Sequence, residues 1–333
     1  MIHDSDIEYH TPADADHTWA ETYFLPVVVP EAGIYAHVYV VARPQLGAMF
    51  NEVAVYGALA QSMPELLAYQ ACQHLPAPEK FSEIDSSMGL SVLALNRRDY
   101  RIDYVGRDGC EIHVDWNGTM EPFDIHDPDH SPNAVAAAEQ RGAGSGAGDA
   151  WQGGHFDMSG RVTGTIVVRD RIFDVNYVER MDRSWGPRDE LALRSMNSIS
   201  ATIGDDLAFH FITYFDPHQP TGDDQVFTHG YVCERGEVRG ISNLDITTIR
   251  RGLMVASMDV IATDVGGRVY ELHATPFVGG PWTPYNSTLM WNSLMRWRAP
   301  EGDGYGVVME VHSLAAQIRQ RGRWLADPPA SVT

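Results

Sequence analysis

Short stretches in which apolar and polar residues alternate recur along most of the chain. The clearest of them covers residues 206–215. Its two sides are Leu207, Phe209, Phe211 and Phe215 against Ala208, His210, Ile212 and Tyr214. Because successive side chains of a β-strand point to opposite faces, this pattern predicts a strand that buries its first side. The second side is semi-polar, so we expect His210 and Tyr214 to line a binding site.

Similar alternating runs are separated by turn-forming residues, as at 168–172 and 265–268. The predicted strands are 33–41, 51–55, 100–104, 111–116, 162–168, 172–175, 226–232, 254–263 and 268–273. Many short strands at this spacing are typical of a β-sandwich or a β-barrel. The pattern therefore predicts an all-β protein.

Helical patterns are few and short. The candidates are 65–73, the alanine-rich stretch 133–140 and the C-terminal stretch 308–321. The segment 131–153 is rich in Gly and Ala, which predicts a flexible loop. A chain of 333 residues exceeds the size at which one hydrophobic core usually stops growing. We therefore expect two domains or one large sheet assembly.

Composition limits the partners. The chain has 24 basic and 45 acidic residues, a formal net charge of −21, so we expect neither a nucleic-acid partner nor an anionic membrane surface. Cys72, Cys110 and Cys233 fit no disulfide or zinc pattern, which favours a reducing, cytoplasmic location. The N-terminal residues lack a signal-peptide pattern, and no window has the run of about 18 apolar residues that a membrane span needs.

Two polar clusters suggest chemistry, and each has a structural alternative. Residues 124–130 concentrate Asp and His, but Pro128 predicts a turn, so a solvated loop or the lip of a binding pocket fits better than a metal site. His155 and Asp157 are two positions apart, so we expect them to share one face of a strand. They form either an acid/base pair or a polar pair at the end of a strand. Glycines at 142–147 match the dinucleotide fingerprint only formally, because they follow a helical pattern instead of a strand. We expect no metal and no cofactor.

Near the N-terminus, His17, Trp19, Glu21 and Tyr23 fall on one side of an alternating stretch. This side either lines a pocket or belongs to an amphipathic edge strand in which Trp19 covers the core. On the first interpretation, Glu21 and Tyr23 are candidate substrate-binding residues.

The stretch 181–190, MDRSWGPRDE, places charged residues around a Trp and a Gly-Pro turn. If Asp182 is buried, it must be paired with an arginine or kept protonated. Paired, it is a structural clamp. Protonated, it is an acid, and Trp185 beside it can stabilise a developing cation through its π face. Arg183 and Arg188 are candidates to bind carboxylates or a substrate oxygen.

Four segments carry a family resemblance: 17–23, 154–155, 160–164 and 179–188. They resemble the carotenoid hydratase-like and kievitone hydratase-like double-lipocalin (calycin-like) family, with Asp-Arg-Ser-Trp-Gly at 182–186 as the most specific part. The resemblance implies two lipocalin-like antiparallel β domains, 1–190 and 191–333, the second with a C-terminal helix. It also implies a hydrophobic cavity near their junction and acid-initiated chemistry without a cofactor, with Asp182 as the proton donor. Where the family pattern often has a histidine, this chain reads Met-Asp-Arg, so His155 is the candidate to replace it.

These features predict a cofactor-independent, acid-catalysed hydratase or dehydratase, or an isomerase or cyclase, acting on a hydrophobic isoprenoid, steroid or prenylated substrate. Asp182 and His155 are the expected catalytic residues. The expected substrate-binding residues are Trp185, Arg183, Arg188, Tyr23, Glu21, Tyr214 and His210. The alternative is a non-catalytic carrier of a hydrophobic ligand, in which Asp182 is salt-bridged, and a third possibility is a metal-dependent hydrolase built on residues 124–130. The direction of the reaction and the oligomeric state stay open.

Overall fold

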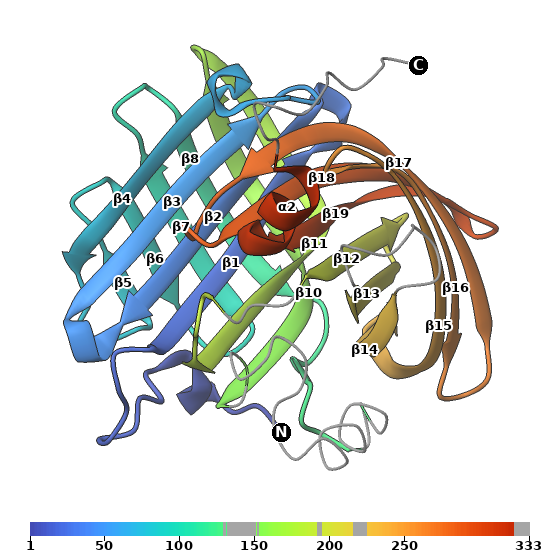
Figure 1. Ribbon diagram of the computed structural model, residues 1–333, viewed down its shortest axis with the longest axis horizontal. Coiled ribbons are helices and arrows are strands. Elements are labelled where there is room, and N and C mark those ends of the chain that lie inside the picture. The colour runs from blue at the N-terminus through green and yellow to red at the C-terminus, as the bar shows by residue number, and fades with distance from the viewer. Residues whose placement is uncertain (129–130, 132–150, 152, 192–194, 216–224, 323–333) are drawn as a thin grey trace.

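The computed structural model of the chain describes residues 1–128, 131, 151, 153–191, 195–215 and 225–322. It consists almost entirely of antiparallel β-strands, which form two barrel-like domains side by side (Figure 1). The expected all-β fold is therefore confirmed. Among the described helices, none combines the length and the apolar character that crossing a lipid bilayer requires.

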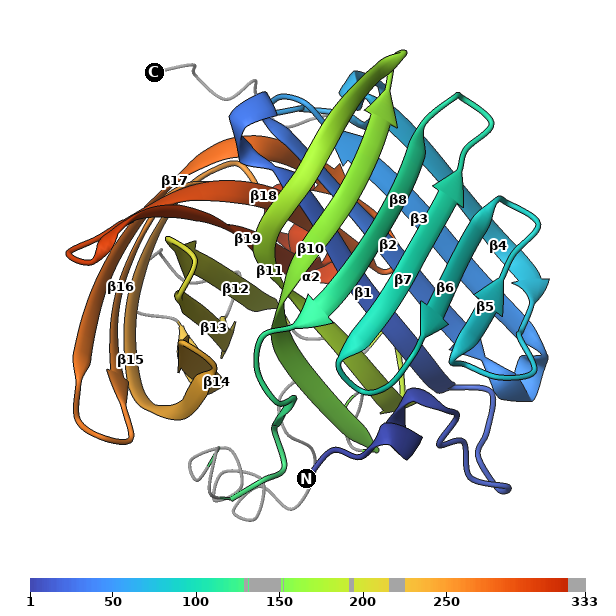
Figure 2. The same ribbon diagram turned by 180° about the vertical axis from the view of Figure 1, so that it is seen from behind.

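The first domain is a curled sheet with the strand order β4-β3-β2-β1-β11-β10-β8-β7-β6-β5, and β9 pairs with β10 (Figure 2). Its strands are β1 (Trp19–Val29), β2 (Ile34–Arg43), β3 (Ala48–Tyr56), β4 (Ala68–Pro76), β5 (Glu83–Asp85), β6 (Leu90–Ala94), β7 (Asp99–Val105), β8 (Glu111–Gly118), β9 (Phe123–Asp124), β10 (Gly154–Val168) and β11 (Arg171–Pro187). The chain leaves the sheet centre after β1 and returns to it in β10 and β11. Residues far apart in the sequence therefore become neighbours there.

The second domain is a closed barrel in which each strand from β12 to β19 pairs with the next and β19 pairs with β12. Its strands are β12 (Met196–Ile203), β13 (Leu207–Tyr214), β14 (Val226–Glu234), β15 (Glu237–Arg251), β16 (Met254–Asp264), β17 (Val269–Trp282), β18 (Thr288–Ala299) and β19 (Gly302–Ser313). Phe209 and Phe211 belong to the barrel core, whereas Ala208, Ile212 and Tyr214 join the apolar cluster shared with the first domain. The two-sided strand predicted for 206–215 is thus confirmed.

The long strands β10 and β11 lie between the two domains (Figures 1 and 2). Their side chains point alternately to the two sides of the sheet. Phe156, Met158 and Met181 pack in the core of the first domain. Asp157 and Asp182 are cross-strand partners in the same pair of strands. Their side chains contact Arg180 and, through Asp157, the barrel residue His210, so this side of the sheet faces the second domain.

Two of the helix predictions need correction. Residues 65–73 are not a helix: a 3₁₀ turn over Met63–Glu65 leads into β4, because that segment pairs with β3. β4 has mixed, mostly exposed positions, so its sequence carries no period-two signal. At the C-terminus α2 covers only Leu314–Arg321, because the preceding residues complete the barrel as β19. The Ser313 hydroxyl caps this helix by accepting the backbone N–H of Ala316. The predicted helix 133–140 lies outside the described residues.

The expected domain limits, 1–190 and 191–333, stay a prediction, although β11 ends at Pro187 and β12 begins at Met196. The expected loop 131–153 falls mostly outside the described residues, as does the glycine motif within it. All three cysteines are free.

Candidate functional site

A cavity of about 70 Å³ lies at the junction of the two domains. We call it the junction cavity. Its lining residues are Thr22, Phe24, Tyr39, Trp151, Asp182, Ser184, Arg188, Met196, Trp282, Tyr285, Met290, Met309 and Val311. Both domains contribute, and most of the wall is aromatic, methionine or aliphatic. Such a lining with a few fixed polar groups is typical of a small-molecule site.

Asp182 is a charged residue of the junction cavity lining, and its partner is Arg180. The guanidinium Nη1 of Arg180 donates to Asp182 Oδ2 at 2.7 Å and to Asp157 Oδ1 at 2.8 Å. Arg180 and Asp157 are buried, and the Asp182 side chain keeps 13% of its surface exposed. Asp182 is therefore paired, which answers the question that the sequence left open. The arginine that pairs with it is neither Arg183 nor Arg188.

Arg188 is the second charged residue of this lining. Its Nη1 donates to the hydroxyls of Tyr285 at 2.8 Å and Tyr39 at 3.1 Å, and its Nη2 donates to Ser184 Oγ at 2.9 Å. The two phenol oxygens are 2.5 Å apart. Ser184 also contacts the Thr22 hydroxyl at 2.7 Å. Burial raises the pKa of the Tyr39 phenol well above its usual value, so this phenol keeps its proton.

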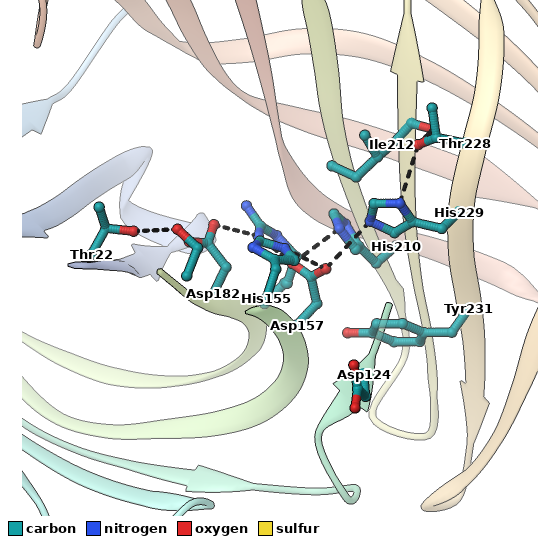
Figure 3. Close-up of polar contacts among 12 residues, drawn as sticks. Thr22, Asp124, His155, Asp157, Asp182, His210, Ile212, Thr228, His229 and Tyr231 are labelled. Carbon is teal, nitrogen blue, oxygen red and sulfur yellow. Dashed lines mark hydrogen bonds and ion pairs between the residues drawn. The ribbon is translucent and has the colours of Figure 1, made fainter. Parts of the chain in front are cut away.

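Behind Asp182, three imidazoles surround Asp157 (Figure 3). His155 Nε2 lies 2.9 Å from Asp157 Oδ2, His210 Nε2 lies 3.1 Å from Oδ1, and His229 Nε2 lies 3.9 Å from Oδ2. Burial lowers the pKa of His210 and, more strongly, that of His229. Burial alone would raise the pKa of Asp157, but the neighbouring His210 and His155 lower it well below its usual range. The expected His155–Asp157 contact is thus present and extends into a larger cluster.

Of the predicted site residues, four lie on this side of the sheet: Asp182, Arg188, His155 and His210. Tyr214 is also buried toward the first domain, and its cross-strand partner Met196 lines the junction cavity, but Tyr214 itself does not. His155 and His210 contact Asp157 and do not line the cavity either. Their expected role in orienting water near a substrate therefore stays a prediction.

The other four predicted residues, Glu21, Tyr23, Arg183 and Trp185, lie on the opposite face of the sheet. Arg183 pairs with Glu21 at 2.5 Å, and Tyr23 stacks on Phe81 in the core of the first domain. The structure therefore separates these residues from Asp182, because neighbours in a strand point to opposite faces.

Trp185 is likewise occupied on that face. Its ring stacks on His10 with ring centroids 4.0 Å apart, and the Arg183 guanidinium lies 5.1 Å from it. Its π face is thus not presented to the junction cavity, so Trp185 is not placed to stabilise a cation there.

Several residues of the site escaped the sequence analysis. Arg180 sits two positions before Asp182 and shares its strand face, so its period-two spacing was an available signal. His229, Tyr39, Trp151, Trp282 and Tyr285 gave no local signal, because they reach the site only through pairing between distant strands.

A second pocket of about 220 Å³ adjoins the first, and Tyr285 lines both. We call it the outer pocket. Its lining residues are Val41, Arg43, Leu46, Ala48, Met49, Phe50, Gln73, His74, Glu190, Pro284, Tyr285 and Asn286. The outer pocket thus combines an apolar wall with a polar rim, where Arg43 pairs with Glu190 at 2.5 Å.

The expected lip at residues 124–130 is tied to the N-terminus. The α-amino group of Met1 binds Asp124 Oδ2 at 2.8 Å, and the backbone N–H of His126 donates to Asp124 Oδ1. Among the described residues, no member of this segment belongs to a group with metal-ligand geometry. Residues 129 and 130 lie outside the described part of the chain.

The chain belongs to the family described as Domain of unknown function (DUF7064), whose model matches residues 3–315. A search of the curated proteins gave no match. Among solved structures, the chain is similar to a protein assigned as AttH from Nitrosomonas europaea, with 13% identity, 88% of this chain and 91% of that chain covered, and a TM-score of 0.55. It is also similar to CghA, with 9% identity, coverage of 90% and 89%, and a TM-score of 0.52. Kievitone hydratase from Nectria haematococca gives 11% identity, coverage of 89% and 88%, and a TM-score of 0.50. At these identities the similarity confirms the fold that the sequence resemblance implied.

Proposed function

We propose that this chain binds an apolar or amphiphilic small molecule in the junction cavity and moves a proton between a substrate carbon atom and Asp182. The reaction is the addition or removal of water, or an isomerisation or cyclisation through the same cation. The observation that carries the proposal is an apolar cavity whose lining includes a carboxylate and an arginine that binds two phenols. The shared fold with a protein named a hydratase agrees with this reaction class.

The ion pair with Arg180 determines how Asp182 would act. A carboxylate that accepts a hydrogen bond from a guanidinium is a base in the resting site. It therefore takes a proton from the carbon next to a developing cation, which is the dehydration direction. By microscopic reversibility the protonated carboxyl is the acid for hydration.

Arg188 with the phenols of Tyr39 and Tyr285 suits a hydroxyl group that leaves or enters. Tyr39 keeps its proton and can donate it to Tyr285, whose own proton is then free for a substrate oxygen. In dehydration the C–O bond breaks, water leaves with the proton of Tyr285, and Asp182 takes the proton from carbon. Arg188 stabilises the phenolate through its two hydrogen bonds. Solvent then returns a proton to Tyr285 and removes one from Asp182.

Aromatic residues in the same lining favour a cationic intermediate. Trp151, Trp282 and Phe24 line the cavity, and the face of an aromatic ring attracts a cation. These residues take the role that the sequence analysis gave to Trp185.

The size of the cavity bears on the substrate. About 70 Å³ accommodates only part of a drug-sized molecule, which usually occupies about 300 Å³ or more. An isoprenoid, steroid or prenylated substrate would therefore span the junction cavity and the outer pocket, past Tyr285.

The test is incubation of the purified protein with a lipid extract of the source cells in water labelled with heavy oxygen, followed by mass spectrometry. A hydratase product carries the heavy oxygen, and a parallel incubation in deuterated water labels carbon in an isomerisation or cyclisation. Asp182→Asn should lower the rate by about a hundredfold or more. Asp174→Asn makes the same chemical change at an exposed position of the same strand and should retain the rate.

A carrier of a hydrophobic ligand is the second candidate, because the Arg180–Asp182 ion pair is what a purely structural role of Asp182 requires. For a carrier, the protein and both variants would return the same unchanged compound from the extract. Its affinity would change little in Asp182→Asn. A retained lipid that is returned chemically unchanged from both labelled waters, with no new product, would replace the lyase proposal by the carrier.

A further inference from the structure

We propose that His155, Asp157 and His229 form a binding site for a divalent transition-metal ion, for which Zn²⁺ is the probe. This site lies beyond the proposed chemistry, which uses no metal, and the two can be tested separately. It differs from the cluster at residues 124–130 and departs from the expectation that the chain has no metal site.

The geometry of the three side chains is the first support. One ligand atom from each of His155, Asp157 and His229 lies within 4.8 Å of the other two, and all three residues are buried. Two atoms bound to one zinc ion at about 2.0–2.2 Å are about 3–3.5 Å apart in ordinary coordination geometry. The two contacts of Asp157 Oδ2, 2.9 Å to His155 and 3.9 Å to His229, lie on either side of that range. A shift of a few tenths of an ångström would bring each of these two contacts into that range.

The hydrogen bonds of His229 are the second and independent support. The hydroxyl of Thr228 donates to the carbonyl oxygen of Ile212 at 3.0 Å, so at its 3.2 Å contact with His229 Nδ1 it can only accept. His229 therefore carries its proton on Nδ1 when neutral, and its Nε2 has a lone pair. This Nε2 is buried without a hydrogen-bond partner and faces the Asp157 carboxylate (Figure 3). Two acceptors facing each other in a buried place indicate that a cation belongs between them.

His210 repeats this arrangement on the other carboxylate oxygen. Its Nδ1 donates to the carbonyl oxygen of Ile199 at 3.0 Å, so in the neutral form of His210 the Nε2 carries a lone pair and lies 3.1 Å from Asp157 Oδ1. An imidazole whose other nitrogen donates to a backbone or hydroxyl oxygen is the usual state of a metal ligand, because this bond fixes the tautomer. Arg180 also binds Oδ1, which leaves Oδ2 for the ion.

The donor set limits the metal. Two neutral imidazoles and one carboxylate suit Zn²⁺ or Fe²⁺ better than Ca²⁺ or Mg²⁺, which prefer oxygen ligands. His155 now donates its Nε2 proton to Asp157, and it would release that proton when Nε2 binds the metal. Trp151 stacks on His155 and also lines the junction cavity, so one aromatic ring separates the ion from the cavity.

Calorimetric titration of chelator-treated full-length protein with Zn²⁺ tests the site. We expect one ion per chain, and His229→Ala should weaken its binding by about a hundredfold or more. The control is His113→Ala, which removes a half-exposed histidine that contacts Asp103 and Glu111 and should leave the high-affinity step unchanged. If the protein binds no stoichiometric zinc, or if His229→Ala binds it as tightly, the proposal is wrong.

A second measurement covers the case in which His229→Ala does not fold. Anomalous X-ray diffraction from zinc-soaked crystals of the unmodified protein would show where the ion binds. An ion at about 2.0–2.2 Å from one atom of each of the three residues supports the site. An ion bound only elsewhere overturns it.

Discussion

Glu179→Gln tests how the junction between the domains responds to pH. Glu179 lies on β11 and is 1% exposed. The Ser200 hydroxyl of β12 donates to its Oε1 at 2.5 Å, and the backbone N–H of Arg180 donates to the same oxygen at 2.8 Å. Burial raises the pKa of Glu179 from 4.5 to about 7, although these two donors oppose the change. The folded protein therefore retains a proton that the unfolded chain has lost between these two pH values.

The direction and the size of the pH effect on stability follow from this difference between the folded and unfolded pKa values. The contribution to stability is complete below pH 4.5 and is lost as the pH rises through about 7, because the buried carboxyl must then ionise or the chain unfold. A difference of about 2.5 between the two pKa values corresponds to about 3 kcal/mol. Burial also raises the pKa values of the nearby phenols of Tyr35 and Tyr177, so neither changes charge in this window.

Urea denaturation of the wild type and Glu179→Gln at several pH values measures the effect. We expect the wild type and the variant to have similar free energies of unfolding near pH 4. Near pH 8 the free energy of unfolding of the variant should be larger by about 3 kcal/mol. Glu237→Gln, an exposed glutamate, controls for the loss of a carboxyl as such. A difference between wild type and Glu179→Gln that stays constant over this range would refute the reasoning.

Two further predictions concern the first domain. Arg183→Met leaves Glu21 as a buried charge without its arginine partner and should lower the free energy of unfolding by about 3–5 kcal/mol. Adding Glu21→Gln should recover part of this loss. An equal loss in the double variant would show that the unpaired charge is not the cause. Gly160→Ala would place a Cβ atom 2.2 Å from the indole of Trp116 and should lower the stability by about 1–3 kcal/mol or more, which thermal unfolding measures. Adding Trp116→Phe should restore part of the lost stability. If the double variant is no more stable, the steric contact is not the cause.

The sequence alone determined the local features of this protein. Alternation with period two predicted the β-strands, and it also predicted that Phe209 and Phe211 turn away from His210, because the alternation is a property of the strand itself. The same rule put His155 and Asp157 on one face, where they are in contact. Patterns failed where pairing between strands overrides them, as in the edge strand β4.

Only the tertiary structure decided which of these residues meet. Asp182 and Arg183 are adjacent in the sequence, yet they lie on opposite faces of the sheet and have different partners, Arg180 and Glu21. The site also needs His210 and His229, which belong to the barrel and reach Asp157 only because the two domains pack face to face. The register of distant strands and the contact between two sheets depend on the whole chain, so no local pattern specifies them.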